Sequence, residues 1–213
     1  SKNNGMKNIK LKICGMKDSE NITEISALQP DYLGFIFWEK SKRNMTLDAI
    51  PKLPETIKKV GVFVDASIQE IATKINQYQL DIIQLHGNES VIFCKNVKKF
   101  SVEVIKVFSI DSTFNFSVVK EYVLAVDYFL FDTKGKLPGG NGITFDWNVL
   151  ENYHFSVPYF LSGGIGTTEI DGLKEFLKSS VANKCYGIDV NSRFEKKPGI
   201  KNKIKLQKFK KLL

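Results

Sequence analysis

Two residues that can move protons each end an apolar run of this 213-residue chain. Cys14 ends Leu-Lys-Ile-Cys, and a thiol becomes a base or a nucleophile where nearby positive charge lowers its pKa. Asp132 ends Tyr-Phe-Leu-Phe-Asp, and burial there would raise the pKa of its carboxyl and suit it to general acid catalysis. Both residues also have a structural interpretation, Cys14 as a buried apolar side chain and Asp132 as a helix N-cap.

A second group of residues suits a phosphate. Two segments, 161–168 and 187–195, combine glycines or small polar residues with the end of an apolar run. In barrel enzymes, the N–H groups of adjacent loops and a helix N-terminus bind phosphate, while the structural alternative is glycines that serve only tight turns. The candidate residues are Gly163, Gly164, Asp189, Asn191, Ser192 and Arg193.

Arg43 and His86 are further candidates for substrate binding. Arg43 has a rigid fork that fits a carboxylate, although a lone arginine is often only a solvated surface side chain. His86 can polarise or orient a substrate group, or support a residue that does so. Residues 135–142 are rich in glycine, and a loop in that place could cover a ligand or simply connect two elements.

Eight short apolar runs would position these residues. They cover residues 9–13, 32–37, 60–64, 82–85, 104–108, 128–131, 159–161 and 186–190. The runs are continuously apolar, as are the strands of a parallel sheet covered by helices. Eight strand–helix units would average about 27 residues each, which is enough for a (β/α)8 barrel. We therefore expect an α/β fold, a single-domain (β/α)8 TIM barrel over residues 1–213, with its active site at the C-terminal ends of the strands.

The alternative architecture is a doubly wound open sheet. That fold usually carries a glycine-rich fingerprint after its first strand, where this chain has Cys-Gly-Met-Lys. In the barrel, the candidate residues would lie around one mouth, because the C-terminal ends of its parallel strands surround the same opening.

Helix patterns fill the spaces between the runs. Ser67 and Thr168 each begin a capping pattern, and residues 22–28 carry an apolar stripe. Segments 47–53 and 114–122 are predicted helices with a less regular period. Residues 200–213 predict a closing amphipathic helix that presents six lysines to solvent, namely Lys201, Lys203, Lys205, Lys208, Lys210 and Lys211, opposite Ile200, Ile204, Leu206, Phe209 and Leu213.

Composition narrows the possible partners and the compartment. The net charge is +8, and because six lysines fall in the last thirteen residues, the rest of the chain carries only +2. A nucleic-acid-binding function would therefore rest on this tail alone. Three widely spaced cysteines and two histidines predict neither a disulfide framework nor a metal site. No apolar run approaches the roughly 18 residues of a membrane span, so we expect a cytoplasmic protein without a membrane or nucleic-acid partner.

Taken together, the segments resemble the phosphoribosylanthranilate isomerases, which are (β/α)8 enzymes of tryptophan biosynthesis. Each matching segment is short and weakly specific by itself. Together the segments follow the family's order over nearly the whole chain, from about residue 7 to residue 203, and this order makes the resemblance specific. The matching segments are Lys12–Gly15, Gly34–Phe37 with Ser41–Arg43, Gly61–Val64, Gln84–Gly87, Phe131–Thr133, Gly139–Gly142 with Phe145–Trp147, Leu161–Gly164, and Gly187–Val190 with Pro198–Lys201.

The resemblance implies an aldose–ketose isomerase, an intramolecular oxidoreductase. Its substrate would be N-(5′-phosphoribosyl)anthranilate, which undergoes an Amadori rearrangement to 1-(2-carboxyphenylamino)-1-deoxyribulose 5-phosphate without a metal or an organic cofactor. By resemblance, Asp132 protonates the ribose ring oxygen and Cys14 takes the C2′ proton. Arg43 would hold the anthranilate carboxylate, Asp189 would lie near the ribose hydroxyls, and the loops around Gly164 and Ser192 would bind the phosphate.

The chain departs from the family pattern at four positions. Asn141 stands where threonine is common, Asn191 stands where serine is usual, and Asn202 replaces a usual aspartate. Arg193 stands where the family usually has glycine, so its side chain either crowds the phosphate or adds a cation to it. An indole-glycerol-phosphate synthase is the nearest alternative enzyme, although it would need a catalytic lysine on a strand and usually an extra N-terminal segment. The expected partner is a small molecule with a carboxylate and a phosphate, and both a monomer and a homodimer remain open.

Overall fold

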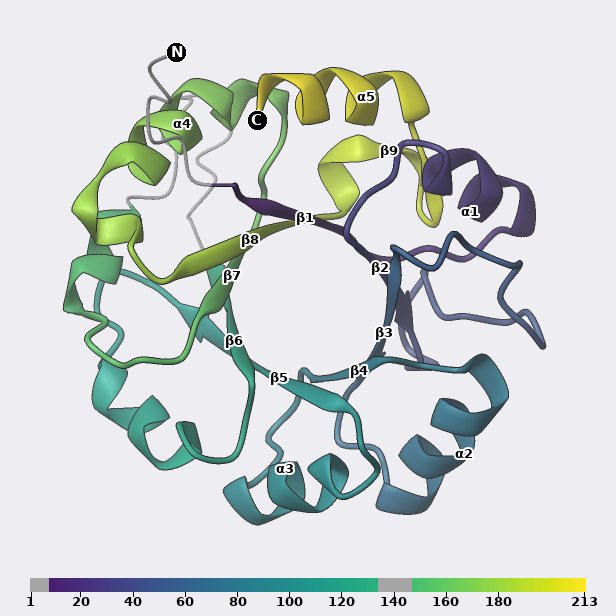
Figure 1. The fold of residues 1–213 in the computed structure, drawn as a ribbon, viewed down its shortest axis with the longest axis horizontal. Helices are drawn as coiled ribbons and strands as arrows, with labels where there is room; N and C mark the ends of the chain where they lie inside the picture. Colours follow the sequence, from purple (N-terminus) through teal and green to yellow (C-terminus); the bar gives the residue numbers. More distant parts are fainter. Residues whose placement is uncertain (1–7, 134–146) are drawn as a thin grey trace.

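The computed structural model describes residues 8–133 and 147–213, which form a closed parallel barrel ringed by helices (Figure 1). The eight strands pair in chain order, and β1 closes the barrel against β8, with Leu11 beside Ile188. The strands are β1 (Lys10–Ile13), β2 (Tyr32–Ile36), β3 (Lys58–Phe63), β4 (Ile82–Leu85), β5 (Glu103–Ile110), β6 (Tyr128–Thr133), β7 (Tyr159–Ser162) and β8 (Cys185–Val190). The (β/α)8 barrel and the eight predicted strands are confirmed, and the open sheet is excluded.

Helices lie outside the barrel (Figure 1), and among the described residues each connection between successive strands contains one except the connection from β2 to β3. The α-helices are α1 (Ser19–Ser26), α2 (Ile68–Tyr78), α3 (Val91–Lys98), α4 (Ile170–Lys178) and α5 (Lys203–Leu212). The 3₁₀ helices are η1 (Phe116–Tyr122), η2 (Trp147–Asn152), η3 (Thr167–Glu169), η4 (Ser180–Ala182) and η5 (Ser192–Phe194), and a hairpin of β9 (Glu195–Lys197) and β10 (Ile200–Lys201) precedes α5. The glycine-rich segment 135–142 lies outside the described residues.

The predicted cap of α2 is confirmed, whereas the predicted cap of α4 is wrong. Ser67 Oγ accepts the N–H of Glu70 at 3.1 Å, which satisfies a first-turn donor that has no partner within the helix. Thr168 cannot act as a cap because η3 already includes it. Its hydroxyl instead accepts a hydrogen bond from Arg193 Nη2 at 3.3 Å.

The two less periodic segments differ from the predicted α-helices. Residues 46–57 form an irregular loop, so the predicted helix over 47–53 is wrong. Pro51 lacks an N–H donor and restricts the residue before it, which explains why no helix forms there. The segment 114–122 is helical, but as the 3₁₀ helix η1, and Asn115 caps it by accepting the N–H of Ser117 at 3.0 Å.

The C-terminal amphipathic helix is confirmed as α5, but it begins at Lys203, and Ile200 lies in β10 instead. Two further residues differ from the prediction. Leu206 and Phe209 are buried, but Ile204, predicted on the same face, is 66% exposed. Lys201 was predicted on the solvent face and is instead fully buried in β10. A buried ammonium requires a partner, and Lys201 Nζ lies 2.7 Å from Glu195 Oε2.

Packed side chains close the barrel at the N-terminal ends of its strands. Leu130 and Phe160 lie in the interior cluster, and the rings of Tyr128 and Tyr186 pack beside them. The hydroxyls of Tyr32 and Tyr186 are 2.9 Å apart. Because these rings fill the lower part of the barrel, ligand binding is left to the C-terminal mouth.

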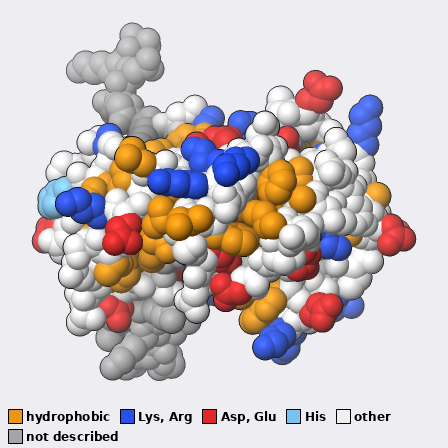
Figure 2. Space-filling model, turned by 90° about the horizontal axis from the view of Figure 1, so that it is seen from below, with side chains coloured by type: hydrophobic (Ala, Val, Ile, Leu, Met, Phe, Trp, Pro, Cys, Tyr) orange, Lys and Arg blue, Asp and Glu red, His pale blue; other side chains and the backbone are white. Residues whose placement is uncertain are grey.

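Charged side chains of both signs lie among apolar ones on the face seen from the α3 side (Figure 2). This mixture agrees with the near balance of charge outside the C-terminal tail. Among the helices of residues 8–133 and 147–213, none has both the length and the apolar character needed to cross a membrane.

Candidate functional site

A cavity of about 210 Å³ opens at the C-terminal ends of the strands. Its walls come from β2, β3, β4, β6, β7 and β8 and from the segments that follow β1, β4, β7 and β8. Nine of the ten predicted site residues line it, namely Cys14, His86, Asp132, Gly163, Gly164, Asp189, Asn191, Ser192 and Arg193. The tenth, Arg43, is not part of the lining and lies beside Gly15 and Asn191.

Cys14 lies directly after β1, with a buried lysine close by. The thiol side chain is 5% exposed, and its backbone N–H donates to Val190 O at 2.9 Å. Burial raises the pKa of the Cys14 thiol, and the positive charges of Lys12 and Lys201 oppose that rise. Burial also lowers the pKa of Lys12, but Asp189 and Cys14 raise it by more, so its net pKa lies above the ordinary value. A thiolate formed at Cys14 would therefore have a cation beside it.

Asp189 connects β8 to both neighbouring strands through its carboxylate. Oδ1 accepts from Lys12 Nζ and Oδ2 accepts from the hydroxyl of Ser162, both at 2.9 Å. The side chains of Lys12 and Asp189 are 0% and 7% exposed. This buried network fixes the direction of Asp189, which also lines the cavity.

His86 and Asp132 line the same cavity from β4 and β6. Asp132 stands in register between Ser109 of β5 and Ser162 of β7. Burial lowers the pKa of His86, and Asp132 opposes this change, so the imidazole is kept neutral near pH 7. Nε2 of Gln84 lies 3.3 Å from His86 Nδ1. The side-chain amide of Gln84 therefore lies within hydrogen-bonding distance of the His86 ring.

A buried ion pair supports the loop that carries His86. The carboxylate of Glu89 accepts the N–H of Gly87 at 2.8 Å and that of Asp65 at 2.9 Å. Lys106 Nζ lies 3.0 Å from Glu89 Oε1, and both side chains are at most 3% exposed. These bonds hold the loops after β3 and β4 together at the C-terminal end of the barrel.

The two predicted phosphate loops lie beside each other at the cavity. Gly163 has φ +110° and Gly164 has φ +62°, a region that favours glycine. A Cβ on Gly163 would collide with the backbone of Thr133, whereas one on Gly164 would meet open space. Arg193 donates to Gly164 O at 3.4 Å and pairs with Glu169 at 3.5 Å, so its guanidinium lies across the loop after β7.

Several buried polar residues of the site were missed by sequence reasoning. Lys12, Gln84 and Ser162 all stand on the strands, inside or at the end of an apolar run, and their side chains reach the cavity or its immediate support. A charged or amide residue within a continuously apolar strand was the available signal, because such a side chain must find a partner in the barrel. Glu195 and Lys201 left no comparable signal, since both stand in a charged, glycine-containing segment.

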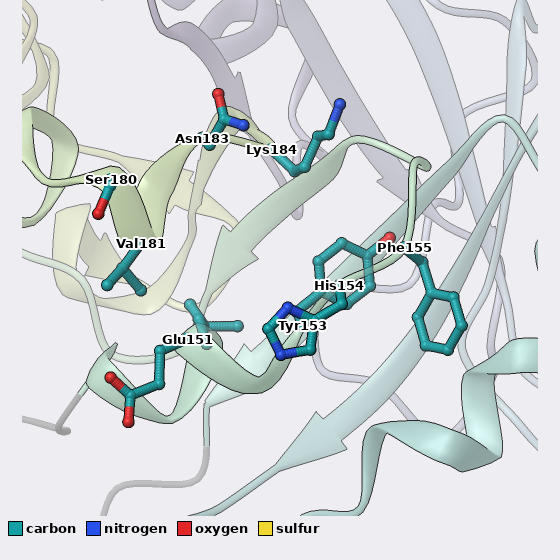
Figure 3. A pocket seen from close by; sticks show the side chains of 9 residues that line it. Glu151, Tyr153, His154, Phe155, Ser180, Val181, Asn183 and Lys184 are labelled. Carbon is teal, nitrogen blue, oxygen red and sulfur yellow. The ribbon is translucent and has the colours of Figure 1, made fainter.

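A larger cavity of about 420 Å³ lies away from these residues, between η2 and η4 (Figure 3). Its walls include Tyr153 and His154, which precede β7, and Lys184, which directly precedes β8. It therefore lies at the N-terminal ends of these strands and contains none of the predicted site residues. We place the functional site in the smaller cavity, because barrel chemistry belongs to the opposite end.

Comparisons with known proteins agree on one family. Residues 11–211 match the family model described as N-(5′-phosphoribosyl)anthranilate (PRA) isomerase. The N-(5′-phosphoribosyl)anthranilate isomerase of Parabacteroides distasonis is 41% identical over 207 residues, covering 93% of this chain and 90% of that protein. A solved phosphoribosyl anthranilate isomerase in complex with reduced 1-(o-carboxyphenylamino)-1-deoxyribulose 5-phosphate has a TM-score of 0.75 and 25% identity, covering 94% and 96% of the two chains. Monomers of the dimeric enzyme from Thermotoga maritima give a TM-score of 0.72 and 26% identity, covering 96% and 97%.

Proposed function

The chain belongs to the N-(5′-phosphoribosyl)anthranilate isomerase family and is an aldose–ketose isomerase of tryptophan biosynthesis, and on that premise we propose how its cavity performs the reaction. The rearrangement converts an aminoaldose into an aminoketose. One proton must be given to the ribose ring oxygen and another must be taken from C2′. Family membership excludes the alternative of an indole-glycerol-phosphate synthase. The proposal therefore assigns these two proton transfers to the two candidate residues.

In the first step of the proposed mechanism, Asp132 is the general acid. Its carboxyl gives a proton to the ring oxygen as the bond between that oxygen and C1′ breaks, and the nitrogen lone pair forms an imine at C1′. The position of Asp132 in the wall of the cavity supports this role. The neutral imidazole of His86, which lines the same cavity, would hydrogen-bond near the same end of the substrate.

In the second step, Cys14 is the general base. Its thiolate takes the proton from C2′, the C2′–H electrons form the C1′=C2′ bond, and the imine nitrogen becomes the amine of an enolamine. This enol then tautomerises to the ketone. Support comes from Lys12, whose ammonium shares its environment with both Cys14 and Asp189, because a cation held in a buried site stabilises the thiolate.

Binding of the substrate would use the cavity together with Arg43, which lies beside it. We assign the phosphate to the loops of Gly163, Gly164 and Ser192, with Arg193 adding a cation beside them rather than crowding them. The carboxylate is assigned to Arg43, since a charged and bidentate contact is worth more than a neutral one. Asn191 and Asp189 would face the sugar between these ends. The chemistry needs only protein groups, so the proposal includes no metal and no organic cofactor.

The observation that carries this proposal is that Cys14 and Asp132, from strands on different sides of the barrel, line one cavity together with the glycine loop. The test mixes purified protein with freshly prepared phosphoribosylanthranilate and follows the loss of its fluorescence. Cys14→Ala and Asp132→Asn should each lower kcat by at least about 100-fold, the usual contribution of a general acid or base. Cys94→Ala, at a buried cysteine of α3, is the matched control and should keep full activity. Undiminished turnover in both site variants would overturn the mechanism.

The remaining proposals concern the domain organisation, the cellular compartment and the partners of the enzyme. We propose that residues 1–213 act as one barrel domain in the cytoplasm, on a small-molecule substrate and without a nucleic-acid or membrane partner. A dimeric form exists for the Thermotoga maritima relative. Light scattering on the purified protein distinguishes a monomer from a homodimer for this chain.

A further inference from the structure

The guanidinium of Arg43 is held from one side by a buried carboxylate. Nε of Arg43 lies 3.0 Å from both oxygens of Glu195, and Nη2 lies 2.5 Å from Oε1. The Glu195 side chain is 4% exposed, against 23% for Arg43. A guanidinium has five N–H donors, and within residues 8–133 and 147–213 the Nη1 group has no hydrogen-bond partner. The pairing with Glu195 therefore leaves the Nη1 side of the guanidinium available to a ligand.

Glu195 is itself anchored from other directions. Its Oε2 accepts from Lys201 Nζ at 2.7 Å and from the N–H of Gly199 at 2.9 Å. Burial raises the pKa of Glu195, but the hydrogen bonds from Arg43 and Lys201 lower it by more, so the carboxyl stays ionised at neutral pH. With these partners Glu195 cannot swing away, and the orientation of Arg43 is set before any ligand arrives.

The cluster is continuous with the wall of the cavity. Lys201 Nζ also donates to Asn191 Oδ1 at 2.6 Å, and Asn191 lines the cavity. Gly15, the residue after Cys14, leaves room for both neighbours, since a Cβ there would lie 2.7 Å from Asn191 Oδ1 and 2.8 Å from Arg43 Cδ. Arg43 and Lys201 bring two cations to one carboxylate, so the cluster keeps a positive charge to offer to an anion.

We propose that Glu195 is a positioning residue that presents Arg43 to the carboxylate of the substrate and so selects carboxylated substrates. The inference rests on the proposed function, in which Arg43 receives the anthranilate carboxylate. An arginine side chain loses rotamer entropy when it is held in one orientation, and holding Arg43 beforehand removes that cost from ligand binding. If Glu195 instead competed with the substrate for Arg43, its removal would tighten binding, so the two ideas predict opposite signs.

The test compares two ligands by calorimetry in wild type and Glu195→Gln. One is the reduced product analogue with its carboxylate, and the other is the same molecule made from aniline, which lacks it. Weaker preorganisation of Arg43 is expected to raise the Kd of a carboxylated ligand about tenfold. We expect Glu195→Gln to weaken the carboxylated analogue by this factor and to leave the Kd of the other unchanged. KM for phosphoribosylanthranilate should rise in step, with kcat nearly constant.

Matched variants keep the test decisive. Glu103→Gln, at a half-exposed surface pair with Lys58, controls for the loss of one acid and should change neither affinity. In an Arg43→Lys background, Glu195→Gln should have little further effect, because its action passes through the guanidinium. If Glu195→Gln fails to fold, Glu195→Asp keeps the charge but shortens the reach, and the same selective loss is expected.

Three results would overturn the inference. Equal weakening of both analogues by Glu195→Gln would show a purely structural role, and unchanged affinity for both would show that Glu195 does not act on binding. Tighter binding of the carboxylated analogue would show competition. The proposed function is tested separately in the wild type. A wild-type protein that turns over phosphoribosylanthranilate but binds both analogues equally would refute the role of Arg43, and one without turnover would refute the mechanism.

Discussion

Replacing Lys12 by Met would remove the cation that faces Asp189 inside the barrel. The two side chains are 0% and 7% exposed and their charged atoms are 2.9 Å apart, so solvent screens the pair little. Removing one partner of such a pair costs about 3–5 kcal/mol. Asp189 would keep the hydroxyl of Ser162 at 2.9 Å, and the Met side chain would fill most of the lysine volume. We therefore expect the lower end of the range, about 3 kcal/mol.

Urea unfolding at pH 7 measures this loss as a change in the free energy of unfolding. The double variant Lys12→Met/Asp189→Asn has no unpaired charge and should regain much of the stability. A Lys12→Met protein within about 0.5 kcal/mol of wild type, the range of ordinary surface substitutions, would refute the energetic importance of the pair. A double variant as unstable as the single one would show that the cost lies in packing.

The same substitution tests the environment of the proposed base. Burial raises the pKa of Cys14, and Lys12 opposes that rise. Without Lys12 the pKa of Cys14 moves further up, so the thiolate forms at higher pH and the ascending limb of the kcat/KM profile shifts to higher pH. A profile whose limb does not move would refute the coupling of Lys12 to the thiol.

Three other substitutions and one titration follow from the structure. In Gly34→Ala the new methyl would lie 2.7 Å from Cys14 Sγ, so we expect about 1–3 kcal/mol of lost stability and a kcat lowered by about 100-fold through displacement of the thiol; wild-type kinetics would contradict this. Gly172→Ala, on an exposed face of α4 with its nearest neighbour at 3.9 Å, is the control and should gain about 0.5–1 kcal/mol in urea unfolding. Ser67→Ala removes the N-cap of α2 and should lose about 1 kcal/mol in the same assay, and no loss would show that solvent replaces the cap. His86 should titrate below the usual 6.5 by NMR because burial lowers its pKa, so its contribution to stability is present above pH 6.5 and decreases as the pH falls through the native pKa. An NMR pKa above 6.5 would reverse that sign.

The strands could be predicted because both of their faces are buried. Helices cover the outer face of the barrel, and packed side chains fill its interior. Such strands are apolar on both faces, and the run 82–85 coincides with β4 (Ile82–Leu85). The ends were less predictable. β5 extends over Glu103–Ile110, beyond the predicted 104–108, because backbone pairing continues past the apolar side chains to Ser109 and Ile110. The predicted helix over 47–53 was wrong because its apolar pattern is short and Pro51 disfavours a helix there.

The sequence also allowed the prediction that the candidate site residues lie close together. A residue that directly follows an apolar run in a parallel barrel lies at the C-terminal mouth, whatever its distance along the chain. Cys14, Asp132 and the Gly163–Gly164 pair meet at one cavity for this reason. The argument needs only the strand ends and the closure of the sheet, both of which local patterns indicate.

Only the tertiary structure decided which charges are partners. Lys12 and Asp189 are 177 positions apart, and Arg43 and Glu195 are 152 apart. Lys201 belongs to a lysine-rich tail in the sequence, yet it is buried beside Glu195. Apolar burial is non-directional and leaves a periodic pattern along the chain. A buried charge is stable only beside an opposite charge or a hydrogen-bonding group. The partner of each buried charge is determined by the closure of the barrel, which brings together residues that are distant along the chain.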